Sequence, residues 1–429
     1  MSVAAAEPAA PRVLGFWSLL TLGINGIVGV GIFLAPGPLA RAVPGSASAL
    51  AFVVTGLLLL PVAWTYGRLG SAYPEDGGPY VWARVALGER FAFGVGFVAF
   101  VSAVLSTAAV VSGLGQFLAP ELGFASGWSR WLFQIGAAVV FSSVALMGLR
   151  LSARVWSALT VLKLLPLAIL AWAGASQLLG HAPSAQPPWL ASGLGRAALL
   201  AVFPLQGFEI VPVPAGEVRG GRRTVLSATL LSLGFAVTLY VLLQLACVYA
   251  LPTSLADSVA PVVEAGAHYT HGFGRGVFAA GANISAIGIA FGMFAMTPRY
   301  LAALGTDSLL GAELSRESRG VPTRALLVTT LAVLVLVSSS TLSGLFVLSS
   351  LAVLLQYAVS AAALFRLAAR GERGLGKLDR VLAPLTLLAI AALAQAAQAA
   401  ELLTLGAILL GGFLLLRGRR ALASGIARR

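Results

Sequence analysis

The sequence predicts an all-α membrane protein with about twelve transmembrane helices. Of its 429 residues, 59% are apolar and only 10% are charged, whereas about a quarter of an average soluble protein is charged. Apolar stretches recur along the chain, and their length is close to the roughly 20 residues of helix that cross a hydrocarbon core of about 30 Å. Basic residues gather in alternate connecting segments. These three observations together indicate an integral membrane protein.

The apolar stretches divide the chain into candidate spans. They begin near residues 15, 47, 91, 131, 154, 196, 224, 276, 323, 342, 381 and 399. Only the short polar stretches SSSTLSG (338–344) and AQAAQAAE (394–401) separate the last four spans. Eleven spans is therefore the alternative count.

The distribution of basic residues predicts the orientation. With the N-terminus in the cytoplasm, the cytoplasmic segments hold 23 of the 28 Lys and Arg residues. Of the other five, Arg41, Arg130, Arg196 and Arg275 lie in segments on the opposite side, and Lys163 lies inside a span. This asymmetry follows the positive-inside rule. It predicts a multi-pass protein of the cell (inner) membrane with both termini cytoplasmic, and it accounts for the net charge of +13 without a nucleic acid partner.

Two charged residues fall inside predicted spans. Lys163, in VLKLLPLAIL, lies roughly 13 Å of helix from Arg154. Glu209, in FPLQGFEIVPVP, is the single carboxylate within a span. Because burial in lipid disfavours a charge, such residues are functional candidates by default. A purely structural role is the alternative for each.

Two spans contain helix breakers. GINGIVGVGIFLAPG (23–37) is glycine-rich, and FPLQGFEIVPVPAG (203–216) contains three prolines. In lipid, broken helices survive only where the freed backbone groups face protein, water or a ligand. We expect the first helix to unwind between about Gly26 and Val30, with close helix packing by the glycines as the alternative.

The interrupted spans are the first and sixth, as in two inverted five-helix repeats. The predicted organisation is a cytoplasmic tail (1–13), a first repeat (14–180), a second repeat (195–368), two further helices (380–417) and a basic cytoplasmic tail (418–429). At such a crossing, the N-terminal ends of the outer half-helices offer N–H groups and the C-terminal ends of the inner halves offer carbonyls. A zwitterionic amino acid matches these two poles.

Four motifs carry a resemblance to a known family. They are GVGIF in the first span, YPEDGGPYVWARVALG (73–88), GFEIVPVPAGEVRG (207–220) and TPRYLAALGTDSLL (297–310). In this order, over roughly the first 330 residues, the chain resembles the amino acid-polyamine-organocation transporter family. The resemblance implies the LeuT-type fold, in which helices 1 and 6 are discontinuous.

The resemblance also implies a substrate site. The substrate carboxylate would bind N–H groups near Val30 and Gly31, and its amino group would face carbonyls near Gly26, Ile27 and Phe203. Phe203 matches an aromatic gate, with simple packing or lipid contact as the alternative. The remaining implied pocket residues are Ser102, Ser106, Gln206, Gly207 and Met293.

Lys163 matches a fifth-helix lysine whose ammonium replaces sodium in some relatives, which makes it the predicted proton-coupled residue. Glu209 lies in the GFE motif and either bridges the broken helices, takes part in pH sensing or plays a structural role.

The expected function is secondary active transport of neutral L-amino acids, coupled to protons and independent of sodium, by a monomer or homodimer. Exchange or export is the first alternative, and a membrane sensor of amino acids is a more distant one. We expect no enzyme activity, because no nucleophile–base pair, paired carboxylates or metal cluster is evident. No cofactor is expected, and His181, His268 and His271 lack the further ligands of a metal site.

Overall fold

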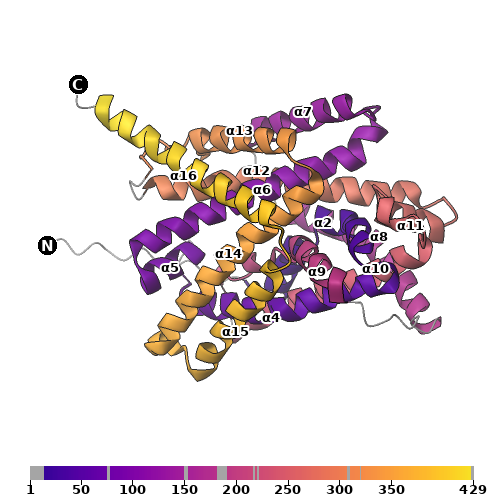
Figure 1. Cartoon of the computed structure of the whole chain (residues 1–429), viewed down its shortest axis with the longest axis horizontal. Helices are drawn as coiled ribbons and strands as arrows, with labels where there is room; N and C mark the ends of the chain where they lie inside the picture. Colours follow the sequence, from indigo (N-terminus) through magenta and orange to yellow (C-terminus); the bar gives the residue numbers. More distant parts are fainter. Residues whose placement is uncertain are drawn as a thin grey trace.

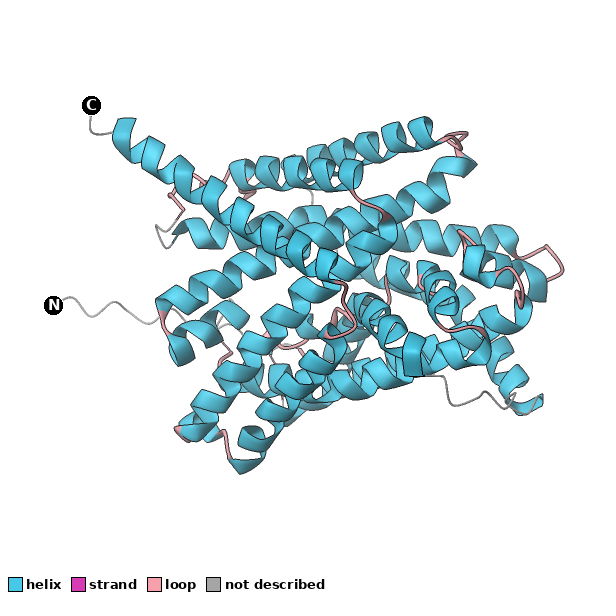
Figure 2. Ribbon diagram, viewed as in Figure 1, coloured by secondary structure: helices cyan, strands magenta, loops and turns pink. Residues whose placement is uncertain are grey.

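The computed structural model describes residues 14–74, 78–148, 153–180, 191–215, 218–219, 222–306, 310–318 and 320–426. Within these ranges every regular element is a helix (Figure 2), and two isolated β-bridges join Leu14 to Val218 and Ser318 to Val321. The α-helices are α1 (Phe16–Ile27), α2 (Val30–Leu34), α3 (Pro36–Ala42), α4 (Leu50–Ala72), α5 (Pro79–Leu87), α6 (Glu89–Glu121), α7 (Gly127–Leu146), α8 (Ala153–Gly180), α9 (Ala191–Leu205), α10 (Arg222–Ala250), α11 (Pro261–Tyr269), α12 (Arg275–Thr306), α13 (Thr323–Ser339), α14 (Leu342–Ala369), α15 (Lys377–Ala394) and α16 (Ala399–Ile426). The 3-10 helices are η1 (Gly45–Ala49), η3 (Phe208–Ile210), η5 (Leu255–Asp257) and η6 (Glu372–Gly374).

Each predicted span begins close to the start of a helix, and the largest difference is Ala191 against residue 196. Within the described ranges, eight helical segments are long and apolar enough to cross a membrane alone. The helices α15 and α16 meet this criterion together, as a pair bent by 114°. The helices α9 and α13 are shorter, with 15 and 17 residues. The total of twelve spans stays a prediction.

The centre of the bundle is formed by two long apolar helices. Within their most apolar windows, 83% of α6 and 78% of α14 is buried, against 22% of α7. Figure 1 accordingly shows α7 and α13 along the upper edge, while α6 and α14 pass through the middle. A helix that is apolar on all sides suits a position surrounded by other helices, whereas α7 leaves an apolar face for lipid.

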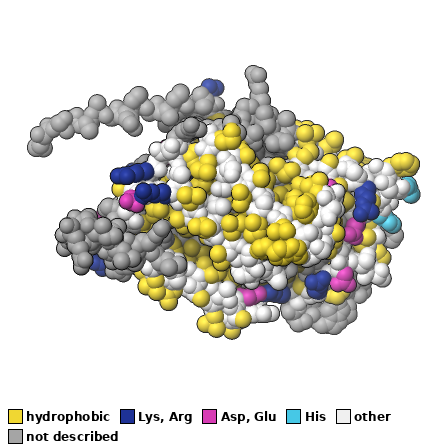
Figure 3. All heavy atoms as spheres, turned by 90° about the horizontal axis from the view of Figure 1, so that it is seen from above, with side chains coloured by type: hydrophobic (Ala, Val, Ile, Leu, Met, Phe, Trp, Pro, Cys, Tyr) yellow, Lys and Arg dark blue, Asp and Glu magenta, His cyan; other side chains and the backbone are white. Residues whose placement is uncertain are grey.

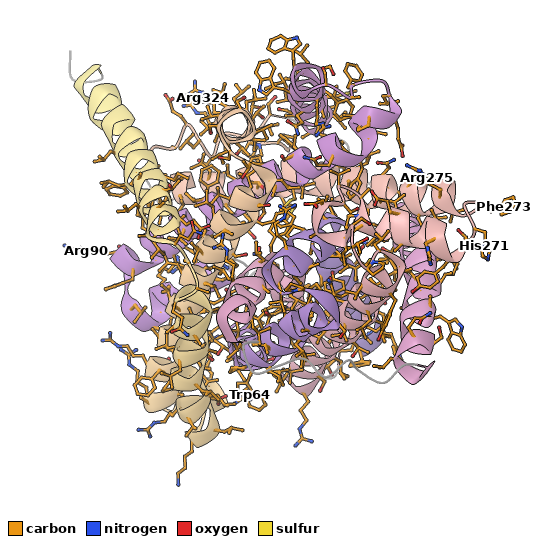
Figure 4. The ribbon with its side chains drawn as sticks, turned by 45° about the vertical axis from the view of Figure 1, so that its right-hand side comes forward. Trp64, Arg90, His271, Phe273, Arg275 and Arg324 are labelled. Carbon is orange, nitrogen blue, oxygen red and sulfur yellow. The ribbon has the colours of Figure 1, made fainter. Side chains whose placement is uncertain are left out.

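The surface agrees with a protein in a bilayer. Apolar side chains spread over the middle of the face shown in Figure 3, and charged side chains lie toward its edges. In Figure 4, Arg90 lies at the opposite end of the molecule from His271, Phe273 and Arg275. The loop before α6 and the loop between α11 and α12 are therefore at opposite ends, as the predicted topology requires.

The first span is interrupted where its glycines predict. The helix α1 ends at Ile27, Val28 and Gly29 adopt extended conformations, and α2 starts at Val30. A Cβ atom at Gly29 would lie 2.5 Å from Cδ1 of Ile289 in α12. Close approach of another helix and loss of helical geometry therefore coincide at this glycine.

The sixth span differs from the expected pair of half-helices. The helix α9 ends at Leu205, Gly207 adopts a left-handed conformation with φ +117°, and η3 and further turns follow as far as Ala215. Pro212 and Pro214 lack the N–H groups that an α-helix needs, so a second helical half does not form in the described part of this segment. The break is thus longer than the one in the first span.

Candidate substrate site

The two interrupted spans meet backbone to backbone. A Cβ atom at Gly26 would lie 2.8 Å from the carbonyl oxygen of Gly207, and a Cβ atom at Gly207 would collide with the backbone of Gly26 and Ile27. Only residues without side chains allow this approach, and Gly207 also has φ +117°. The structure therefore brings the predicted residues Gly26, Ile27 and Gly207 together.

The second half of the first span contacts the end of α9. A Cβ atom at Gly31 would lie 2.9 Å from Cα of Pro204 and 3.3 Å from the ring of Phe203. Because α2 starts at Val30, the N–H groups of its first turn have no acceptor within the helix. Val30, Gly31 and Phe203 thus lie together, as the predicted site requires.

The direction in which α9 runs corrects one expectation about the sixth span. The helix α9 runs toward the break and ends there at Leu205, so it presents C-terminal carbonyls to the site. Its start lies beside the end of α3, where a Cβ atom at Gly193 would contact the carbonyl of Ala42. The predicted outer half of this span therefore offers carbonyls, not N–H groups. The chain direction explains the reversal, since the sixth span crosses opposite to the first.

Lys163 of α8 reaches the first break. Its ammonium donates hydrogen bonds to the carbonyl oxygens of Val28, at 2.6 Å, and Asn25, at 3.2 Å. The side chain is 4% exposed. The last carbonyls of an α-helix carry a partial negative charge, so a cation at this position stabilises the interrupted end of α1.

A second side chain binds the same helix end and was not predicted. Tyr240, from α10, donates its hydroxyl to the carbonyl oxygen of Ile27 at 2.9 Å. Its ring is fully buried and packs edge-on against Phe52 of α4. Lys163 and Tyr240 together occupy acceptor positions at the end of α1, so a substrate amino group would share these carbonyls or use others.

Glu209 lies at the second break. Its carboxylate accepts a hydrogen bond from the N–H of Gly207 at 2.8 Å. The hydroxyl of Tyr357 from α14 lies close to this carboxylate, although it does not meet hydrogen-bond geometry. In this arrangement Glu209 holds the turn at Gly207, which gives its structural alternative a physical basis.

An aromatic cluster lies beside Glu209. The ring of Tyr66 packs edge-on against Trp82, Phe208 and Tyr357, with centroids 5.2, 6.2 and 5.3 Å away. The Tyr66 hydroxyl accepts a hydrogen bond from Gln356 at 2.9 Å. We call Tyr66, Trp82, Phe208 and Tyr357 the inner aromatic cluster, and it joins α4, α5, η3 and α14.

The predicted gate residue Phe203 is stacked on Phe346 of α14, with ring centroids 4.1 Å apart and an interplanar angle of 16°. Phe203 is 8% exposed and Phe346 is 1% exposed. The alternative in which Phe203 contacts lipid is therefore wrong, whereas a gate role and ordinary packing both agree with the stacking. Phe346 and Tyr357 are eleven residues apart in α14, so the ring pair and the inner aromatic cluster lie at different levels along this helix.

Polar side chains of α6, of α14 and of the break in the sixth span meet next to the aromatic pair. The hydroxyls of Ser106 (α6) and Ser349 (α14) are 2.6 Å apart, and the Ser349 hydroxyl lies 3.5 Å from Oε1 of Gln206. The Nε2 atom of Gln206 is buried and has no hydrogen-bond partner among the described residues. A buried donor without a partner is costly, so this amide is available to a bound polar group.

The other two pocket candidates lie one helical turn from contacts with the breaks. Ser102 is 5% exposed and precedes Ser106 by four residues in α6. Met293 follows Ile289 by four residues in α12, and Ile289 packs on Gly29. Residues four apart share a helix face, so both candidates lie on faces that include a contact with the site. Their contact with substrate stays a prediction.

His268 lies near the end of α11, His271 lies in the loop that follows it, and Cys247 lies in α10. The described residues contain no group of His, Cys, Asp and Glu that could hold a metal ion, and His181 lies outside the described residues. The segment 75–77, in the motif after the second span, also falls outside them. Cys247 is fully buried, and its thiol donates a hydrogen bond to the carbonyl of Pro261.

Comparison with known families decides what kind of protein has these two joined breaks. The family model described as amino acid permease matches residues 14–402. The chain belongs to this amino acid permease family. The permease is therefore a multi-pass membrane protein of a transporter family with amino acids as its substrate class, and the expectation that it is not an enzyme is confirmed.

Individual relatives are distant but cover much of the permease. An uncharacterized transporter of Mycobacterium tuberculosis is 28% identical over 359 residues, which is 81% of the permease and 79% of that protein. The branched-chain amino acid permease BcaP of Bacillus subtilis is 29% identical over 252 residues, covering 55% and 54%. Cationic amino acid transporter 4 of Homo sapiens is 24% identical over 330 residues, covering 71% and 51%.

The residues that sequence reasoning missed come mainly from α10 and α14. Tyr240, Phe346, Ser349 and Tyr357 all contact the interrupted spans or residues beside them. The signal in α14 was the polar run Ser349–Ser350, followed by a glutamine and a tyrosine in an otherwise apolar helix. The helix α14 contains no helix breaker beyond its first turn, so the pattern that marks the two interrupted spans does not mark it.

Proposed function

We propose that the permease transports neutral L-amino acids, coupled to protons and independent of sodium, by alternating access between two sides of the membrane. The observation that carries the proposal is the ammonium of Lys163 on the carbonyls of Asn25 and Val28. Backbone carbonyls at a broken helix are the ligands that transporters of this architecture use for a coupling ion. A lysine at this position supplies the cation from the protein itself.

A neutral substrate fits the charges around the breaks. Glu209 is the carboxylate at this place, and it accepts the N–H of Gly207 and lies beside Tyr357. An acid engaged in this way is a poor partner for a cationic side chain. The relative named as a branched-chain amino acid permease agrees with a neutral substrate, whereas the relatives named as cationic amino acid transporters favour the opposite.

A first experiment identifies the substrate, and a second tests whether its uptake is coupled to protons. A thermal-shift screen of all amino acids and common amines on the purified permease identifies ligands. We expect uptake of the hits into proteoliposomes to rise with an inward proton gradient and to stay unchanged when choline replaces sodium. Binding without any flux would favour a sensor, and stimulation only by internal substrate in counterflow would favour an exchanger.

Lys163→Ala tests the coupling residue. We expect it to abolish the dependence of uptake on the proton gradient, because the cation on the α1 carbonyls is lost. Ligand-induced thermal shifts measured in parallel distinguish lost coupling from a lost fold. Lys163→Arg, which keeps a fixed charge, is the matched variant and is expected to retain binding without proton dependence. Unchanged proton-dependent uptake in Lys163→Ala would mean that Lys163 does not couple protons.

A further inference from the structure

The last helix of the permease is joined to the helix that carries the gate. Arg196 of α9 and Glu401 of α16 form a bidentate ion pair, with the two guanidinium–carboxylate distances at 2.7 and 2.6 Å. Their side chains are 29% and 16% exposed. Two parallel hydrogen bonds between charged, partly buried groups fix an orientation as well as a distance. We call this pair the outer tether.

Glu401 is itself held in place by the start of α16. Its carboxylate also accepts the backbone N–H of Gln398 at 2.9 Å, three residues before it. This is the bond by which an acidic residue in the first helical turn reaches back to the residue that precedes the helix. The chains also pack closely beside the ion pair, since a Cβ atom at Gly195 in α9 would lie 3.5 Å from Cβ of Ala396 in the α15–α16 connection.

The outer tether lies on the same face of α9 as the gate residue. Arg196 and Phe203 are seven residues apart, which is about two turns or roughly 10 Å of helix. Phe203 stacks on Phe346 of α14, and α14 packs against α16. Both rings of the aromatic pair are therefore carried by helices that α16 contacts, one through the ion pair and one through packing.

We propose that Arg196 and Glu401 are positioning residues for transport, which hold α9 beside α14 so that Phe203 and Phe346 stay stacked over the substrate site. The proposal rests on the proposed role of Phe203 as a gate. It gives α16, which lies outside the predicted inverted repeats, a place in the transport cycle. When the ion pair is weakened, the arrangement with the rings apart becomes more populated.

The closing experiment measures access to the site directly. A reporter cysteine is introduced as Ser106→Cys, beside Ser349, which follows Phe346 by one helical turn in α14. Its rate of modification by a membrane-impermeant thiol reagent, applied from the predicted outer side, is compared with and without Glu401→Gln. The parent permease, in which Cys247 is fully buried, gives the background.

Glu401→Gln removes the charge but keeps an oxygen for the N–H of Gln398, so the start of α16 is preserved. We expect roughly fivefold faster modification of the reporter cysteine, the change that a partly exposed ion pair worth about 1 kcal/mol would produce. Arg196→Lys, which keeps the charge but not the paired geometry, should give a smaller increase. Asp257→Asn removes the exposed ion pair with Arg41 and should change nothing.

The outcomes separate this inference from the proposed function. Modification of the reporter at equal rates with Glu401→Gln, with Arg196→Lys and without either would overturn it, even if the permease takes up amino acids as proposed. A faster rate together with no amino acid uptake by the parent permease would support the tether and contradict the transport proposal. An increase with Asp257→Asn as large as with Glu401→Gln would mean a general loosening of the fold, which also overturns the inference.

Discussion

At the scale of single residues, the site depends on two glycines in contact. Gly207 combines φ +117° with a backbone contact to Gly26. A Cβ atom is unfavourable in that conformation and has no room at that contact. The sequence pointed to both residues because they stand in interrupted spans, but it could not show that they touch, since the contact joins segments far apart in the chain.

Gly207→Ala tests this contact. We expect a loss of roughly 2 kcal/mol or more of unfolding free energy, because strained backbone and a collision occur together. Thermal unfolding of the purified permease measures the loss, and ligand-induced shifts show whether the site persists. The matched control is Gly136→Ala in α7, where no atom lies within 4 Å of the new Cβ. A helical position of this kind should be neutral or gain up to about 1 kcal/mol, and equal melting temperatures for both variants would contradict the close contact.

At the scale of elements, helix positions were predictable and helix partners were not. Each apolar stretch forms a helix because lipid and the bundle interior both require satisfied backbone groups. The face of α14 that contacts Phe203, Gln206 and Phe208 has no breaker or charge to mark it. Its role depends on which helices pack together, and that information is not present in the hydropathy of α14.

The C-terminal pair of helices makes a second unpredicted contact, at the start of α15. Asp379 accepts two hydrogen bonds from Arg68 of α4 at 2.8 Å and one from Trp64 at 2.9 Å. The N–H of Gly376 donates a further bond at 2.8 Å. Trp64 is labelled in Figure 4, near α15. The side chain of Asp379 is 2% exposed, so its charge depends on these partners.

Asp379→Asn should therefore lower the unfolding free energy by about 3 kcal/mol, since it leaves Arg68 partly buried without its countercharge. Thermal unfolding measures the effect. The control is Asp257→Asn. The side chain of Asp257 is 85% exposed, and an exposed ion pair such as the one it forms with Arg41 is worth about 1 kcal/mol or less. If both variants melted alike, Asp379 would not hold α15 to α4.

At the scale of the whole molecule, two aromatic contacts lie at different levels of the bundle. Phe346, which stacks on Phe203, and Tyr357 of the inner aromatic cluster are eleven residues apart in α14, which is about 16 Å of helix. A transporter that works by alternating access needs a separate barrier on each side of its site, because a site open to both sides would leak. Which side is outer is a prediction from the positive-inside pattern, and an experiment can test it independently.

The orientation is tested with two exposed positions at opposite ends, labelled in Figure 4. Phe273, in the loop between α11 and α12, is 96% exposed, and Arg90 is exposed at the start of α6. In right-side-out vesicles we expect a membrane-impermeant thiol reagent to modify Phe273→Cys but to reach Arg90→Cys only after the membrane is permeabilised. The buried Cys247 keeps the background low. This orientation is expected because the excess of Lys and Arg near span ends marks the cytoplasmic side. The reverse pattern would place both termini outside. It would also exchange the sides assigned to the aromatic pair and the inner aromatic cluster.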